Sequence, residues 1–184
     1  MDPEPTPLLI LFIESIDYWL VSSIIILFVL LTLSALISGA EVAFFSLSKA
    51  DITKTSESKS SMHKIVVKLL ENPQKLLATI LISNNFINIL IVLIFAYIGD
   101  TLFSEITPVV LKFAIEVILV TFLILLFGEV LPKVYATRNS LKFASFMAYP
   151  IKILNSLLTI VSLPLMSLTN VIENKLGKKQ SNLS

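Results

Sequence analysis

The chain has 184 residues, of which 55% are hydrophobic and only 15% are charged, and its formal net charge is +1. Soluble domains carry about a quarter charged residues, and a core of this size could not enclose so much apolar surface. The composition therefore excludes a soluble globular domain and a disordered chain, and the presence of only four glycines excludes a collagen-like repeat. We expect an all-α integral membrane protein.

Three long apolar segments predict three transmembrane helices, at about residues 18–47, 76–99 and 108–132. At 1.5 Å per residue, each is long enough to cross about 30 Å of hydrocarbon. They define a transmembrane domain at 18–138, preceded by an extracytoplasmic segment at 1–17. Because that segment lacks the basic region of a cleaved signal peptide, the first span is expected to stay in the mature protein.

The other segments predict amphipathic helices. In HKIVVKLLENP (63–73), apolar residues recur at helical spacing between lysines, and Asn72-Pro73 ends that helix. The preceding stretch TSESKSS (55–61) is expected to be mobile. Residues 139–176, broken by Pro150 and Pro164, predict one or two helices at the membrane interface, a juxtamembrane belt. The alternative is a kinked fourth span at 153–171, and residues 177–184 are expected to be a disordered tail.

Basic residues collect on one side of the predicted spans. Residues 49–75 hold six lysines, and Lys133 and Arg138 follow the third span, whereas 1–17 and 99–107 hold no Lys or Arg. Since these residues favour the cytoplasmic side, we expect the N-terminus outside and the C-terminus in the cytoplasm. The expected location is the inner (plasma) membrane of the cell.

Several classes of function are disfavoured. There is no cysteine, so disulfides, thiolate metal sites and thiol nucleophiles are excluded. The single histidine, His63, stands in a Lys- and Ser-rich stretch and is expected to face solvent. No nucleophile–base pair or phosphate-binding glycine loop is evident, so we do not expect an enzyme.

Polar side chains inside spans are costly and mark functional sites by default. Counted from the nearest basic residue, Glu129 lies about 6 Å, Asn84 about 14 Å and Ser38 about 16 Å into the membrane. Residues four apart on a helix share one face. Three helices therefore offer oxygen atoms in the cytoplasmic half of the bilayer. The polar residues and glycines of interest are Ser34, Ser38, Gly39, Glu41, Asn84, Asn85, Asn88, Glu116, Gly128 and Glu129.

Pro132 adds a backbone oxygen to this set. It has no N–H, and its ring clashes with the carbonyl four residues earlier, which is that of Gly128. That carbonyl is left free beside Glu129 and must face protein, water or an ion. Hydroxyl, amide, carbonyl and carboxylate oxygens suit Mg²⁺, Ca²⁺ or Na⁺ and are poor ligands for zinc or copper.

A purely structural interpretation stays open for each of these residues. Small and polar residues in membrane helices often serve only to pack and to form hydrogen bonds between helices. Glu116 can pair with Lys112, four residues earlier. Glu41 can pair with a lysine at the inner membrane surface.

Three ordered motifs resemble those of the CNNM/CorC family of magnesium transporters: SGAEVAFFSLSKADI (38–52), NPQKLLATILISNNFIN (72–88) and FGEVLPK (127–133). The chain departs from the family pattern at Ser83 and Asn85. The resemblance implies three transmembrane helices, a juxtamembrane helical belt and assembly as a homodimer. Members of that family usually continue into cytoplasmic CBS modules that bind ATP, which these 184 residues do not include.

The resemblance also implies a site and an activity. It implies a dehydrated Mg²⁺ in an inward-facing cavity, with Na⁺-coupled Mg²⁺ export as the function. The alternative is a non-transporting membrane scaffold or an ion-sensing subunit of an envelope complex. A proton-translocating module on Glu116 and Glu129 is weaker, because about 20 Å of helix separates them. By motif position, the implied ligands are Ser38, Asn84, Asn88, the Gly128 carbonyl and Glu129, and the supporting residues are Ser34, Gly39, Glu41 and Pro132.

Overall fold

The computed structural model describes residues 18–48, 50–53 and 60–159, and its named elements are all helices. The third long helix, Val109–Arg138, is continuous but contains a π-helical segment, η1. In chain order the elements are α2 (Tyr18–Phe45), α4 (Ser61–Leu70), α5 (Pro73–Leu102), α6 (Val109–Leu123), η1 (Ile124–Val130), α7 (Leu131–Arg138) and α8 (Ser140–Leu157).

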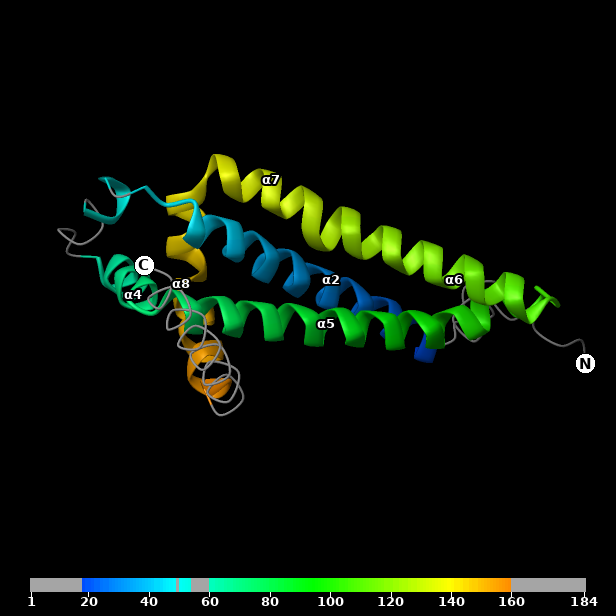
Figure 1. The fold of residues 1–184 in the computed structure, drawn as a ribbon. Helices are drawn as coiled ribbons and strands as arrows, with labels where there is room; N and C mark the ends of the chain where they lie inside the picture. The colour runs from blue at the N-terminus through cyan, green and yellow to red at the C-terminus, as the bar shows by residue number, and fades with distance from the viewer. Residues whose placement is uncertain (1–17, 49, 54–59, 160–184) are drawn as a thin grey trace, which may run out of the picture.

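Three helices are long and apolar enough to cross a membrane: Tyr18–Phe45, Pro73–Leu102 and Val109–Arg138. They confirm the predicted all-α membrane fold with three spanning helices. With 28 to 30 residues each, they are about 42–45 Å long, so their ends extend beyond about 30 Å of hydrocarbon. Figure 1 shows them lying lengthwise beside one another, with α4 and α8 gathered at one end.

The helix boundaries follow local chemistry. α4 ends at Leu70 and α5 begins at Pro73, as the Asn72-Pro73 signal predicts. Proline suits this first turn, where its missing N–H would have no helical partner. The second long helix thus begins three residues before the apolar stretch, and the third continues past Pro132 to Arg138.

The expected break at Pro150 does not occur, because α8 runs through this residue to Leu157. Pro150 and Phe146, whose carbonyl loses its donor, both lie on the exposed side of α8. A proline on this side is accommodated by a gentle curve of the helix that is convex outward, toward the exposed side. Pro164, most of the alternative fourth span, the tail at 177–184, the segment 1–17 and most of TSESKSS lie outside the described residues.

The buried apolar residues form two clusters. A small one, Ile91, Phe95 and Val120, joins α5 to α6. A larger one lies where α2 meets α4, α5, α7 and α8, and it includes five alanines that are fully buried. Small side chains let membrane helices approach closely. We call this end of the bundle, where α5 begins and α7 ends, the basic end, because Lys75, Lys133 and Arg138 lie there.

Candidate functional site

Side chains from three helices meet in a polar cluster between α2, α5 and η1, here called the inner cluster. The hydroxyl of Ser34 donates to Asn88 Oδ1 at 2.8 Å and also lies 3.3 Å from Asn84 Oδ1. Asn88 Nδ2 in turn lies 3.5 Å from Glu129 Oε1. The sequence-based expectation that the three spans bring oxygen atoms together here is matched by this geometry.

The inner cluster is rich in negative potential. Two amide oxygens converge on the single hydrogen of the Ser34 hydroxyl, which is fully buried. In the part of the chain that the structure describes, Glu129 forms no ion pair. A carboxylate in a low-dielectric setting needs a compensating charge. The arrangement therefore suits a bound cation.

Gly128 allows η1 to approach α2 at the inner cluster. A Cβ atom added to Gly128 would lie 2.9 Å from Ser34 Oγ. Any larger residue would push the serine away from the two asparagines. Glycine is therefore required here by close packing as well as by the access that it gives to its own backbone.

The π-helix supplies backbone oxygens beside Glu129. The N–H of Leu131 donates to Leu126 O, five residues earlier, which is the π pattern. Pro132 follows and can donate neither to Phe127 O in that pattern nor to Gly128 O in the α pattern. The Gly128 carbonyl, predicted to be free, therefore lies at the end of a π-helical turn, which is wider than an α-helical one. The π-helix was not predicted from the sequence. The feature that indicates it is Pro132, which lies four residues after Gly128.

Ser38 lies one turn along α2 from Ser34. It is fully buried, and among the described residues its hydroxyl oxygen has no hydrogen-bond partner. Leaving a buried hydroxyl unsatisfied costs about 1–3 kcal/mol. An additional ligand would remove that cost, so Ser38 fits the proposed ligand set, although no contact joins it to the asparagines.

Two of the predicted supporting residues have structural roles at the basic end. Gly39 packs against the ring of Phe143 on α8, where an added Cβ would lie 2.6 Å from Cζ. Glu41 forms an ion pair with Lys133 at 3.3 Å, and both side chains are about one-third exposed. Pairing with a lysine was the structural interpretation left open for Glu41, and this ion pair links the end of α2 to α7.

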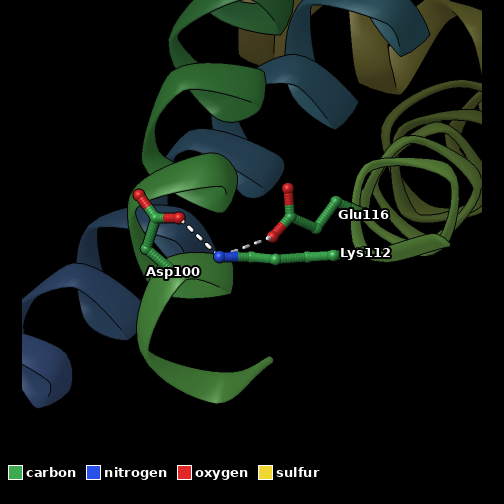
Figure 2. A network of polar contacts seen from close by, with 3 residues as sticks. All are labelled: Asp100, Lys112 and Glu116. Carbon is green, nitrogen blue, oxygen red and sulfur yellow. Dashed lines mark hydrogen bonds and ion pairs between the residues drawn. The ribbon is translucent and has the colours of Figure 1, made fainter. Parts of the chain in front are cut away.

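A second polar cluster, the outer cluster, lies at the far end of the bundle. Lys112 Nζ lies 2.7 Å from Asp100 and 3.9 Å from Glu116, as Figure 2 shows. The expected pairing of Glu116 with Lys112 is therefore confirmed. The Glu116 carboxylate rests against Gly99, where a Cβ would lie 2.5 Å from Oε1.

The remaining polar residues do not join the inner cluster. Ser83 donates to Thr79 O within its own helix. Asn85 is exposed on the outer face of α5, beside an open groove of about 440 Å³ that Asn88 also lines. His63 is only partly exposed, and its buried Nδ1 has no hydrogen-bond partner within the part of the chain that the structure describes. Among the described residues, no three His, Asp or Glu side chains come together. A cation in the inner cluster would thus be held by one carboxylate and neutral oxygens.

Comparison with known proteins identifies the family to which this sequence is similar. The family described as the cyclin M transmembrane N-terminal domain, CNNM, matches residues 25–184. This match covers most of the chain, including most of α2, all of α5 and η1, and the inner cluster.

Curated proteins of similar sequence include two bacterial and one animal relative. A UPF0053 protein of Haemophilus influenzae is 38% identical over 152 residues, covering 83% of this chain and 34% of the relative. The inner membrane protein YfjD of Escherichia coli, also UPF0053, is 33% identical over 144 residues, covering 78% and 32%. The metal transporter cnnm-4 of Caenorhabditis elegans is 33% identical over 162 residues, covering 82% and 32%.

The chain spans about a third of the length of these relatives. On the strength of the family match over residues 25–184, the chain is a membrane protein that belongs to the CNNM family.

Proposed function

We propose that this chain is the membrane domain of a Mg²⁺ transporter. The single observation that carries the proposal is the unpaired carboxylate of Glu129 beside two converging amide oxygens. The name of the animal relative, a metal transporter, supports the same class of cargo. The ligands that we propose are Ser38, Asn84, Asn88, the Gly128 carbonyl and Glu129.

The donor set fits the chemistry of this ion. Mg²⁺ prefers oxygen ligands and gives up its water reluctantly, so several well-placed oxygens must replace that water. In the proposed site Glu129 balances part of the charge, and the neutral oxygens of Ser38, Asn84 and Asn88 complete the coordination. A single carboxylate also limits the affinity, and a transport site must release its ion as well as bind it.

The wider setting is part of the same proposal. Lysines and Arg138 at the basic end support an orientation with that end in the cytoplasm, in the inner membrane of the cell. Transport would proceed as Mg²⁺ export coupled to Na⁺ entry, with Glu41 serving the site or the Na⁺ pathway. The exposed amide of Asn85 is costly against lipid and supports a homodimer that covers this groove. CBS-type domains would belong to a longer protein.

A second candidate is a non-transporting scaffold or an ion-sensing subunit. The observation that favours it is the hydrogen bond from Ser34 to Asn88, which joins α2 to α5 without any ion. Under this candidate the polar residues of the inner cluster hold the helices together. Their loss would then lower stability equally with and without Mg²⁺.

A pair of isosteric variants distinguishes the two candidates. We expect Mg²⁺ to raise the unfolding temperature of the purified chain in a saturable way, because a ligand that binds only the folded state stabilises it. Glu129→Gln should abolish this rise, whereas Glu116→Gln, which removes the same charge from the outer cluster, should keep it. A full Mg²⁺ response in Glu129→Gln would refute the ion site. Flux of Mg²⁺ into liposomes, with and without Na⁺, then tests transport and coupling.

A further inference from the structure

A groove of about 300 Å³ lies at the basic end, between α4, the start of α5 and α8. It is separate from the inner cluster and shares none of its residues. Four lysines contributed by the three helices line it, together with the amide of Asn155 and the apolar side chain of Leu69: Lys64 and Lys68 from α4, Lys75 from α5 and Lys152 from α8.

The groove carries an excess of positive charge. In the part of the chain that the structure describes, none of its four lysines forms an ion pair. One carboxylate, the exposed Glu71, lines an adjoining hollow with Lys64 and Lys68 and offsets only part of the charge. Because four lysines converge with only one carboxylate nearby, their positive charges repel one another, and a bound anion would relieve this repulsion.

The groove lies at the level of lipid headgroups. α5 has 30 residues and is about 45 Å long, which exceeds the hydrocarbon thickness by about 15 Å. Lys75 is in its first turn, so this residue lies outside the hydrocarbon and within the headgroup layer. Basic pockets between helices at this depth bind anionic lipid headgroups.

α8 offers an apolar surface beside the lysines. One of its faces is buried in the bundle, and the other carries large apolar side chains that are between 46% and 67% exposed: Phe146, Tyr149, Ile153 and Leu157. Such a face is stable against acyl chains and costly against water. The charged groove and the apolar face thus match the two parts of a phospholipid.

A neutral donor completes the groove. Thr79 Oγ1 lies 2.9 Å from Lys75 O and 3.0 Å from Asn155 Oδ1, so its single hydrogen is shared between these two oxygens. Among the described residues Asn155 Nδ2 forms no hydrogen bond, so it can donate to a phosphate oxygen. We propose that this groove binds the headgroup phosphate of an anionic phospholipid from the leaflet at the basic end of the bundle.

Lipid titration of the detergent-solubilised chain, followed by native mass spectrometry, tests the proposal. The probes are phosphatidylglycerol and phosphatidylcholine with identical acyl chains. The test variant is Lys68→Gln with Lys152→Gln. The matched control is Arg138→Gln with Lys142→Gln, which removes two exposed charges from the same end but outside the groove. All four side chains are exposed, so neither pair should impair folding.

We expect the unmodified chain to prefer phosphatidylglycerol. The groove variant should bind it about thirtyfold more weakly, as the loss of two lysine contacts predicts, and the control less than threefold. An equal loss in both variants would show general surface attraction and overturn the groove. Absence of preference between the two lipids would also overturn it. Displacement of the lipid by millimolar glycerol phosphate would assign the groove to a soluble phosphate instead.

Discussion

Glu116 and Glu129 lie on the same long helix, thirteen residues apart, in opposite electrostatic settings. Glu116, in the outer cluster, shares Lys112 with Asp100, so its counter-charge is part of the protein. Glu129, in the inner cluster, is contacted by Asn88 Nδ2 at 3.5 Å, and Asn88 in turn accepts a hydrogen bond from Ser34. Among the described residues Glu129 has no cationic partner.

The presence or absence of a cationic partner within the protein distinguishes a structural carboxylate from one that is suited to a mobile ion. A carboxylate that is paired within the fold gains nothing from an added cation, whereas an unpaired one does. The mere presence of an acidic residue in a span is therefore a weak indicator of a transport site. The identity of the groups around the carboxylate is a stronger one. Three sets of variants test this, from the largest expected effect to the smallest.

Asn88→Lys would give Glu129 a partner within the protein and make the inner cluster resemble the outer one. We expect the Mg²⁺ affinity, measured from the rise of the unfolding temperature with Mg²⁺ concentration, to fall more than a hundredfold. The reason is that the lysine ammonium group would occupy the place of the cation. Gln74→Lys, which adds the same charge at the exposed start of α5, should keep the response. A saturable Mg²⁺ response in Asn88→Lys would contradict the comparison.

Lys112→Met makes the reverse change and leaves Glu116 without a partner. Both side chains are at least 80% buried, so we expect unfolding to become easier by about 2–3 kcal/mol. Adding Glu116→Gln should recover at least half of this loss, as measured by chemical denaturation in detergent. Asp100→Asn serves as the control, because the Asp100 side chain is 78% exposed and its contribution should be small. Absence of rescue would show that Lys112 acts through packing alone.

Gly128→Ala tests the close approach of η1 to α2. Its Cβ would lie 2.9 Å from Ser34 Oγ, so we expect a loss of about 1–2 kcal/mol in stability and about tenfold in Mg²⁺ affinity. In Gly99→Ala the contact is instead with the free end of the Glu116 side chain, which can move, and Mg²⁺ affinity should not change. Mg²⁺ titrations followed by thermal unfolding measure both variants. Equal Mg²⁺ affinity in the two would show that the position of Ser34 is irrelevant to the ion.

Much of the fold can be predicted from the sequence because hydrocarbon imposes simple rules. The apolar runs locate all three spanning helices, and Asn72-Pro73 locates the junction between α4 and α5. The helix ends are harder, because a helix continues into the headgroup layer, where polar residues are tolerated. The effect of Pro150 was wrongly predicted, since local rules do not show that its strained side faces away from the bundle.

The candidate site could be predicted in part. Depth along each helix puts Asn84 and Glu129 in the same half of the membrane, at about 14 Å and 6 Å from the nearest basic residue, and Asn88 links them in the structure. Depth does not specify the rotation of one helix against another. The family resemblance, and not the depth, implied Ser38 as a ligand and Ser34 as a supporting residue; in the structure Ser34 makes the hydrogen bonds to the asparagines.

The π-helix at 124–130 also determines how the third span must be counted. Hydrogen bonds that reach five residues back add one residue to the turn, which equals about 100° of α-helical rotation. The 3.6-residue periodicity of α6 is therefore shifted by one residue when it continues in α7. Side chains that share one face of the span in α6 line up with positions in α7 that are one residue later than an uninterrupted α-helix would give. Deleting a single residue within 124–130 would restore a continuous α-helical periodicity through the whole span. It would then turn Lys133 and Arg138 about 100° away from their present direction.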